Sequence, residues 1–386
     1  MSLSSLRFGG LLLALIAVVS LAGCDSGNEE EEETLFEQTG DLDDRLEEVA
    51  DSSSKRSSSV VASLAPPAVD GQVVSAADIV VDGSRVYVAY LLPGEEAKGG
   101  LDILTAKNPT DVSSAASFVS RDFEVASVHQ WSSNEIFLGG GYLGVDIAVT
   151  SPALLIEVNR DLTLRNSIDL ESFLVTDVSV GKGKTVLATT GDRGGRLYLM
   201  DDRLRILDSQ EAEDARSVIS ADDYAFVLSG DGLVRRFEID RRSLSEATII
   251  AELGALPGLT AAKITFAEER EELIVPLNDR GVAFIPRAVE RQPGTAVFMT
   301  AEQVGWIVQG IEAENERYYL ATANRGVTVV DRTDDGARVL EVIPIPGDQV
   351  NVIATDDDFL YVASGNGGTS IVAIGDDDDD DDDDDD

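Results

Sequence analysis

The chain has 386 residues and is strongly acidic, with 72 Asp and Glu residues against 30 Lys and Arg and a formal net charge of −42 at pH 7. Part of this excess lies in two acidic runs, residues 29–33 and 376–386; without them and without Arg7, 56 acidic and 29 basic residues leave a net charge of about −27. A surface of this sign repels nucleic acid and anionic lipid headgroups, so we expect no nucleic-acid partner.

The basic residues are mostly arginine, with six Lys against 24 Arg. An acidic, lysine-poor surface is typical of proteins from halophiles, in which carboxylates keep the surface hydrated and salt screens their repulsion. An acidic secreted protein from an ordinary habitat is the alternative interpretation.

A short apolar run near the start of the chain predicts a targeting segment. Arg7 is the only charge before it, and residues 11–19 are too few to span a bilayer. The run ends in LAGC, residues 21–24, which resembles the bacterial lipobox, in which the cysteine is lipidated and the preceding segment removed. We therefore expect a lipoprotein signal peptide at residues 1–23 and a lipid anchor on Cys24. An uncleaved anchor and an ordinary signal peptide are the alternatives.

The stretch after the cysteine predicts a tether and gives a hint of location. Residues 24–59 are acidic and then Ser-rich, and the interval 34–50 is compatible with a short amphipathic helix that has Leu35, Leu42, Leu46 and Val49 on one side. An acidic run after the lipidated cysteine resembles the surface-export signal of some Gram-negative lipoproteins, whereas an Asp directly after it resembles an inner-membrane retention mark. We expect a membrane lipoprotein, in the outer membrane or at the cell surface rather than in the inner membrane.

From residue 60 onward, short apolar runs alternate with turn residues, and one unit recurs. Its second strand, an apolar run that commonly contains an aromatic residue and Ala, recurs at intervals of 39 to 50 residues. This period is typical of four-stranded propeller blades, so the sequence predicts an all-β, seven-bladed β-propeller over residues 60–375, with a β-sandwich or a solenoid as alternatives. The seven copies begin near Val86, Ile136, Val186, Ala225, Leu273, Tyr318 and Leu360.

The seventh copy runs out after its third strand, where Gly375 leads into the aspartate run. Residues 60–64 form an apolar run that belongs to no other copy. We predict that this N-terminal run supplies the missing outer strand of the last blade, which pairs its open edge and closes the ring. Residues 376–386 are expected to form a disordered, solvated poly-Asp tail, because eleven adjacent carboxylates cannot pack against each other.

Two copies of the repeat carry a family resemblance. The runs GLDILTAKNPT, residues 100–110, and GVTVVD, residues 326–331, resemble the repeat of bacterial LVIVD-type propeller proteins. In that repeat a strand that ends in a run similar to Leu-Val-Ile-Val-Asp precedes an Asp- or Asn-Pro turn. The resemblance implies an exported propeller and leaves its biochemical role open, because the family's general function is unsettled.

The sequence offers little for catalysis. His129 is the only histidine in the chain, we expect it on the first strand of the second blade, and a lone histidine in a strand is usually a packed residue. No Gly-x-Ser-x-Gly elbow is present. One histidine and one cysteine exclude a zinc site built from His and Cys. We therefore assign no catalytic residue.

Carboxylates near the propeller axis leave a calcium site open as an alternative. Calcium needs only oxygen ligands, and first strands line the channel of a propeller. Candidates in or just before predicted first strands are Asp78, Glu124, Asp177, Asp214 and Asn351. The two tryptophans, Trp131 and Trp306, are too few for the one-per-blade pattern of quinone-dependent propellers, so they are interpreted as packing or rim contacts. Residues 139–141, three glycines, are interpreted as a turn without a phosphate site.

These observations favour a binding or scaffold module whose loops meet a protein or glycan ligand at one rim of the propeller. No cofactor is assigned. A calcium-dependent hydrolase or lactonase with axial carboxylates is the second hypothesis, and a subunit of an outer-membrane assembly is the third. The membrane contact is expected through the lipid on Cys24.

Overall fold

The protein was analysed as a computed structural model of the full chain. The structure describes residues 35–40, 42–48, 58–94, 96–107, 111–132, 134–145, 147–191, 194–256, 262–287, 296–305, 307–314, 317–323, 325–333, 336–346, 349–356 and 358–374. The predicted signal peptide, the predicted lipidation site Cys24, the poly-Asp run and Trp306 lie outside these ranges. None of the helices in the described ranges has the length and apolar character that a membrane crossing needs.

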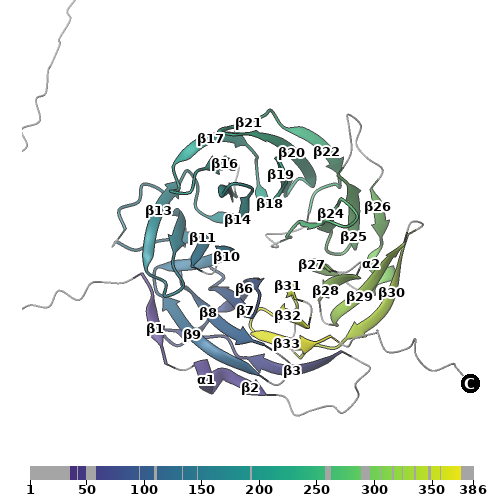
Figure 1. Cartoon of the computed structure of the whole chain (residues 1–386), viewed down its shortest axis with the longest axis horizontal. Coiled ribbons are helices and arrows are strands. Elements are labelled where there is room, and N and C mark those ends of the chain that lie inside the picture. Colours follow the sequence, from purple (N-terminus) through teal and green to yellow (C-terminus); the bar gives the residue numbers. More distant parts are fainter. Residues whose placement is uncertain are drawn as a thin grey trace, which may run out of the picture. The chain divides into compact units, whose positions relative to one another are not determined.

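Seven antiparallel sheets follow one another around a ring, which confirms the predicted seven-bladed β-propeller (Figure 1). The first strand of each blade is innermost, and the later strands lie progressively farther from the axis. Blade 1 contains β6 (Ser75–Asp82), β7 (Arg85–Leu91), β8 (Gly99–Ala106) and β9 (Val112–Ser120). Blade 2 contains β10 (Phe123–Ser132), β11 (Glu135–Tyr142), β12 (Ala153–Val158) and β13 (Leu164–Leu170). Blade 3 contains β14 (Val175–Gly181), β15 (Thr185–Thr190), β16 (Arg196–Met200) and β17 (Ile206–Glu211).

Blades 4 to 7 continue in the same order, and blade 4 carries two short strands on its third strand. Blade 4 contains β18 (Ala215–Ala221), β19 (Tyr224–Ser229), β20 (Leu233–Asp240), β21 (Ser243–Leu244) and β22 (Thr248–Glu252), and blade 5 contains β23 (Thr265–Ala267), β24 (Glu272–Pro276), β25 (Val282–Pro286) and β26 (Val297–Met299). Blade 6 contains β27 (Val308–Glu314), β28 (Arg317–Thr322), β29 (Gly326–Thr333) and β30 (Gly336–Ile343). Blade 7 contains β31 (Val352–Thr355), β32 (Phe359–Ala363) and β33 (Thr369–Ala373).

The hydrophobic core is divided into layers between neighbouring blades. The second strands are buried on both faces, since each lies between two other strands of its blade and between two neighbouring blades. In one layer, Phe226 and Leu228 of blade 4 pack with Leu273 and Val275 of blade 5. This burial on both faces explains why the second strand was the most regular apolar signal in the sequence.

The ring is closed as predicted by the N-terminal strand β3 (Ser59–Leu64). It pairs antiparallel with β33, with Ser59 opposite Ala373 and Leu64 opposite Thr369. The prediction that β3 is the outermost strand of the blade was wrong, because β2 (Leu46–Glu48) pairs with its free edge. Blade 7 therefore has five strands, two of which come from the start of the chain.

Part of the predicted tether belongs to the folded body. Residues 35–40 and 42–48, which we call the perimeter clasp, contain β1 (Glu37–Thr39) on the outer edge of blade 1, the helix α1 (Leu42–Arg45), and β2 on the outer edge of blade 7 (Figure 1). The helix expected over residues 34–50 is thus a single turn. Both flanks become strands instead, because the two outer blade edges offer unpaired backbone groups.

The perimeter clasp is held by apolar contacts and one buried ion pair. Phe36 meets Phe123 edge to face with ring centroids 6.1 Å apart, and Leu42 is buried in the core layer of blades 7 and 1. Arg45 donates from Nη1 and Nη2 to the two carboxylate oxygens of Asp102 at 3.0 and 2.8 Å, and from Nη2 to Ser117 Oγ at 2.8 Å. Since Asp102 is fully buried, Arg45 is its counterion across the seam of the ring.

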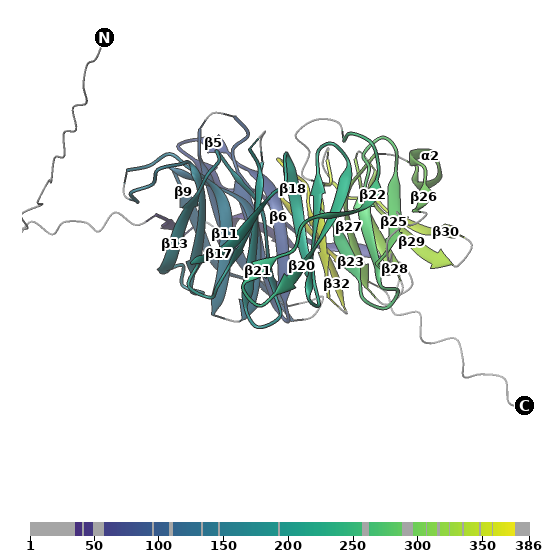
Figure 2. The ribbon, with the colours of Figure 1, turned by 90° about the horizontal axis from the view of Figure 1, so that it is seen from above.

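The two faces of the ring carry different connections. The linker face, as we call it, carries the connections from one blade to the next, including the hairpin of β4 (Ala68–Val69) and β5 (Gln72–Val73) and the helix α2 (Ala301–Val304), which lie on the same face in Figure 2. The opposite turn face carries the turns between first and second strands. Each innermost strand therefore runs from the linker face to the turn face.

The three glycines at residues 139–141 lie inside β11, so their interpretation as a turn was wrong. These strand positions are glycine because neighbouring strands of the same chain come too close to leave room for a side chain. A Cβ atom on Gly140 would lie 1.7 Å from the carbonyl oxygen of Glu124, and one on Gly139 would lie 2.6 Å from Val175 Cγ1. Glycine is needed there for close packing between strands and blades.

Candidate functional site

The innermost strands place one residue from every blade at the same level around the axis. In five blades the pairing of first and second strands shifts by one residue, and the residue after the shift lies at this level. In blades 5 and 7 the register of β23 with β24 and of β31 with β32 gives the corresponding position. We call these seven residues the axial ring: Asp78, Ser127, Asp177, Ser217, Lys263, Gly310 and Val352.

The next position along each innermost strand is apolar and β-branched in all seven blades. These side chains are buried between neighbouring blades, where the stiff branched shape suits a strand. They form an apolar belt directly beside the axial ring, and the belt consists of Ile79, Val128, Val178, Val218, Ile264, Ile311 and Ile353.

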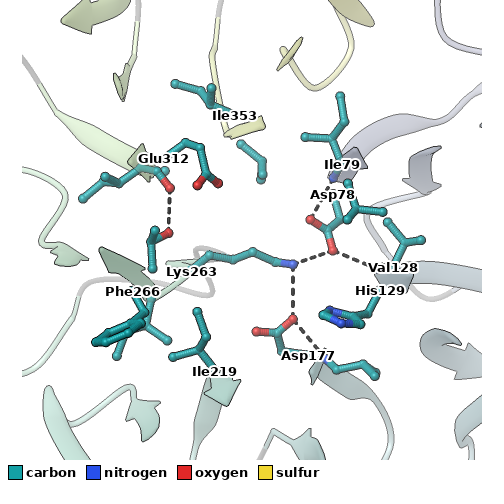
Figure 3. Close-up of a pocket in the computed structure, with 17 residues that line it drawn as sticks. Asp78, Ile79, Val128, His129, Asp177, Ile219, Lys263, Phe266, Glu312 and Ile353 are labelled. Carbon is teal, nitrogen blue, oxygen red and sulfur yellow. Dashed lines mark hydrogen bonds and ion pairs between the residues drawn. The ribbon is translucent and has the colours of Figure 1, made fainter. Parts of the chain in front are cut away.

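Lys263 reaches across the axis and joins two of the predicted carboxylates (Figure 3). Its Nζ lies 2.5 Å from Asp78 Oδ2 and 3.2 Å from Asp177 Oδ1, and the two aspartates come from blades 1 and 3. Burial raises the pKa of Asp78 although Lys263 opposes the shift. Burial alone would lower the pKa of Lys263, but Asp177 and Asp78 outweigh it and raise that pKa. Lys263 therefore stays protonated, and both carboxylates share its ammonium.

The same carboxylates connect blades through hydrogen bonds. Asp78 accepts from the backbone N–H of Val128 in blade 2 at 2.8 Å. Asp177 accepts from Ser127 Oγ of blade 2 at 2.8 Å and from Ser217 Oγ of blade 4 at 2.7 Å. Each carboxylate thus has both a cation and neutral donors, which is what a buried charge requires.

Blades 4 to 7 are joined near the axial ring by single hydrogen bonds and by a close approach of two backbones. Ser217 Oγ accepts from the N–H of Ile264 at 3.1 Å, and Thr265 Oγ1 donates to the carbonyl of Ile311 at 2.7 Å. At Gly310 a Cβ atom would lie 2.4 Å from the carbonyl oxygen of Asn351, so blades 6 and 7 approach backbone to backbone. The axial ring is therefore a structural hub of the propeller.

A cavity of about 210 Å³ lies beside the axial ring (Figure 3), and its lining residues continue from the ring along the first strands toward the turn face. Its walls are the apolar belt apart from Val218, with further apolar side chains, and its polar groups include Lys263, His129 and Glu312. Burial, assisted by Lys263, lowers the pKa of His129 to about 4, so the imidazole is neutral at pH 7. Burial raises the pKa of Glu312 to about 7, although the N–H of Ala313 donates to its Oε1 at 3.1 Å. We call this space the axial cavity.

The predicted carboxylate set is brought together only in part. Asp78 and Asp177 converge, whereas Glu124, Asp214 and Asn351 do not line the axial cavity. Among the described residues, no group of three or more His, Cys, Asp or Glu side chains is placed to hold a metal ion. Lys263 lies between the two converging aspartates, where a shared cation would sit. Calcium remains a prediction without support from these two residues.

Two other predicted residues are located near the axis or the rim. His129 lies on β10, the first strand of blade 2 as predicted, and lines the axial cavity. Trp131 follows two residues later and is 40% exposed, so its interpretation as a rim contact fits. Sequence reasoning missed Lys263 and Glu312, although aligning the seven first strands would have placed both on the axis-facing positions.

The linker face carries the most exposed large apolar side chains of the described residues. Val145 is 89% exposed, Leu143 57%, Phe173 53% and Val73 52%. The first two lie in the loop between β11 and β12, Phe173 lies in the connection from blade 2 to blade 3, and Val73 lies in β5. We call Leu143, Val145 and Phe173 the rim patch.

The loops that carry the rim patch are tied together at their bases. Ser151 Oγ donates to the carbonyl of Ser172 at 2.5 Å and accepts from the Ser172 N–H at 3.1 Å. The N–H of Ile147 donates to the phenol oxygen of Tyr142 at 3.0 Å. Beside them, burial raises the pKa of Glu124 to about 7. The rim patch is therefore presented on a fixed support.

These features define a β-propeller, and comparison with known proteins gives the same fold. The chain is similar to the WD40 propeller domain of Doa1 (TM-score 0.57, 12% identity, 82% of this chain and 97% of that one) and to the RRP9 WD40 repeats (TM-score 0.59, 12% identity, 82% and 97%). It is also similar to a chain of a mitotic checkpoint complex (TM-score 0.58, 15% identity, 78% and 94%). No protein-family model and no curated protein matches the chain, so the LVIVD resemblance stays a prediction.

Proposed function

We propose that this chain is an exported lipoprotein, anchored through Cys24 in the outer membrane or at the cell surface, whose propeller binds another protein with the rim patch. The binding role depends on one observation: the four most exposed large apolar side chains of the described residues lie on the linker face. Exposed apolar groups that lie together on a fixed support are typical of protein-binding surfaces.

The rim patch favours a protein over a glycan as the ligand. Its three side chains offer apolar surface, which aliphatic and aromatic side chains cover well. Glu124 adjoins it: a Cβ atom on Gly141 would lie 2.7 Å from Glu124 Oε1 and 3.2 Å from the Phe173 carbonyl oxygen. A partner with apolar side chains beside a basic residue therefore matches both the patch and the acidic character of the chain.

The binding function is tested by removing the apolar patch and leaving the fold intact. Full-length protein carrying Leu143→Ser and Phe173→Ser is used to capture partners from detergent-solubilised membranes. The matched control carries Phe298→Ser and Leu340→Ser, which are 50% and 45% exposed on the outer strands β26 and β30. We expect partner recovery to fall at least tenfold with the first variant and to persist with the control. Equal recovery from both variants would contradict the proposal.

The anchor is tested separately with Cys24→Ser. Metabolic labelling with a radioactive fatty acid should label the wild-type chain and not the variant, because the thiol is the acyl acceptor. The variant should also leave the membrane fraction, since several acyl chains provide the attachment at about 0.8 kcal/mol per buried methylene. Unchanged labelling or membrane attachment of the variant would refute the lipoprotein assignment and leave the rim patch to be judged on its own.

A further inference from the structure

The axial cavity contains polar groups whose hydrogen-bonding capacity the fold does not use up. Thr265 is engaged with the Ile311 carbonyl, and Lys263, Asp78 and Asp177 are engaged with one another. Glu312 has a single backbone donor at one carboxylate oxygen. Figure 3 shows its carboxylate and the His129 imidazole among the side chains that line the cavity. An apolar cavity with a few convergent polar groups is the usual form of a small-molecule site.

The charges that face this cavity favour a cation. With Glu312 ionised and His129 neutral, three carboxylates face one ammonium, so Asp78, Asp177, Glu312 and Lys263 together carry a net charge of about −2. Because these charges are buried in apolar surroundings, water and salt screen them weakly, and their attraction for a cation is stronger. An anionic ligand would meet Glu312 and the acidic surface of the whole chain, which opposes its entry.

The chemistry of the walls separates an organic cation from a metal ion. Calcium takes six to eight oxygen ligands, and here Asp78 and Asp177 are already shared with Lys263, which leaves the carboxylate of Glu312. An alkylammonium ion needs far less: a carboxylate for the charged group and apolar surface for the chain. Glu312 supplies the first, and the apolar belt with Ile219 supplies the second.

The size and access of the cavity limit the ligand further. At roughly 30 Å³ for each water-sized group, 210 Å³ holds about seven heavy atoms. The side chain of Lys263 is 22% exposed, so solvent reaches the deepest cation of the site. Since the residues that line the cavity start at the axial ring and continue toward the turn face, a ligand enters on the side opposite the rim patch.

We propose that the axial cavity binds a small alkylammonium ion, with its ammonium on the Glu312 carboxylate and its alkyl chain along the apolar belt. This site does not depend on the function proposed for the rim patch.

The binding should depend on pH in a defined direction. Lys263 before β23, Asp78 on β6, His129 on β10 and Asp177 on β14 line the cavity with Glu312. Glu314, on the same strand as Glu312, does not line the cavity, and its charge adds to the raised pKa of Glu312. Because the pKa of Glu312 is raised to about 7, the carboxyl is mostly neutral below that pH and loses its attraction for a cation. Affinity should therefore fall roughly 30-fold between pH 8 and pH 5.5.

The test is titration calorimetry of the full-length protein with n-pentylammonium, with 1-pentanol and pentanoate as probes of equal length. We expect n-pentylammonium to bind and both controls to bind at least tenfold more weakly. Equal binding of 1-pentanol would overturn the proposal in favour of a plain apolar cavity. Calcium that binds in the same cavity more tightly than n-pentylammonium, shown by competition, would overturn it in favour of a metal site.

Two variants assign the binding to the cavity. Glu312→Gln should weaken n-pentylammonium binding at least tenfold at pH 8, whereas Glu314→Gln on the same strand should leave it within twofold. Ile219→Trp fills the cavity without changing its charge and should abolish binding; it keeps the test decisive if Glu312→Gln does not fold. Unchanged binding in Glu312→Gln or Ile219→Trp would contradict the proposed position.

Discussion

Two buried aspartates show how this acidic chain handles charge inside its fold, one at the axis and one at the perimeter. Asp78 shares the ammonium of Lys263 with Asp177, so one cation serves two carboxylates from different blades. Asp102 accepts two hydrogen bonds from the guanidinium of Arg45, whose other donations go to the neutral oxygens of Ser117 and Ala65. A compact ammonium suits acceptors in several directions, whereas the planar fork of arginine matches a single carboxylate.

The comparison also separates two structural tasks. Lys263 holds together blades 1, 3 and 5, which are not neighbours, and leaves a cavity beside it. Arg45 joins the perimeter clasp to blade 1, at the seam where the first and last blades meet. Lys263 therefore stabilises the arrangement of blades around the axis, whereas Arg45 stabilises the closure of the ring. Stability measurements on the two sites should separate these tasks.

The largest loss of stability is expected for Lys263→Met. The substitution leaves Asp78 and Asp177 buried without their cation, and breaking a buried ion pair in this way costs about 3–5 kcal/mol. Urea unfolding measures the free energy of unfolding. The control is the triple variant that adds Asp78→Asn and Asp177→Asn, which should recover most of the loss because no uncompensated charge remains. A loss below about 1 kcal/mol in the single variant would contradict the structural role.

A smaller loss of unfolding free energy, about 2–3 kcal/mol, is expected for Arg45→Met at the perimeter, because Asp102 is left without its cation. The loss is smaller than at the axis because the clasp can separate from Asp102 and let water reach it. Arg45→Lys restores the charge without the fork and should recover part of the loss. Limited proteolysis should cut the clasp of Arg45→Met faster than that of the wild type. Equal cleavage rates would show that the apolar contacts alone hold the clasp.

The axial cavity contains two groups with opposite effects on pH stability. Burial lowers the pKa of His129 to about 4, so the unfolded chain binds this proton first and stability falls as the pH drops from 6.5 to 4. The raised pKa of Glu312, about 7, makes the folded chain bind its proton first, so stability rises as the pH drops from 7 to 4.5.

Single variants should expose these opposing effects. Between pH 7.5 and pH 5, His129→Asn should gain stability relative to the wild type and Glu312→Gln should lose it, each on the order of 1–2 kcal/mol. Urea unfolding at the two pH values provides the measurement. Parallel pH dependence in all three proteins would mean that neither group changes its protonation on folding in this range.

The smallest effect is expected at an exposed ion pair. Arg338 Nη2 lies 3.0 Å from Asp331 Oδ2, with the two side chains 70% and 32% exposed. Surface pairs of this kind contribute little because water screens them and two long side chains must be ordered. Arg338→Ala should therefore change the free energy of unfolding by less than about 0.5 kcal/mol. A change as large as that of Arg45→Met would show that exposure is a poor guide in this protein.

The blade architecture was predictable from the sequence, because each second strand is buried on both faces and leaves a local apolar signal such as that near Val86. The N-terminal closure was predictable because residues 60–64 formed an apolar run outside the repeat. The short strands β1 and β2 were not, since three residues carry no periodicity; β1 pairs with β9, far along the chain, and β2 pairs with the nearby edge strand β3. Edge pairing decided the structure of both strands and limited the helix to Leu42–Arg45.

The candidate site was predictable only in part, for a physical reason. The convergence of Asp78 and Asp177 followed from their places on first strands, which line the axis. Lys263 just precedes a short strand, β23, that begins at Thr265, so its level on the axis depends on register. Lys263 and Asp78 are 185 residues apart in the sequence, so no local sequence pattern could predict their contact.

The pairing of β3 with β33 has a consequence for synthesis. β3 leaves the ribosome early, whereas its partner residues follow roughly 300 residues later, about 15–60 s at the usual 5–20 residues per second. During that interval the waiting strand presents backbone groups that are free to pair with another nascent copy. We therefore expect dense polysome translation to favour strand-swapped dimers, and slower initiation to favour closed monomers.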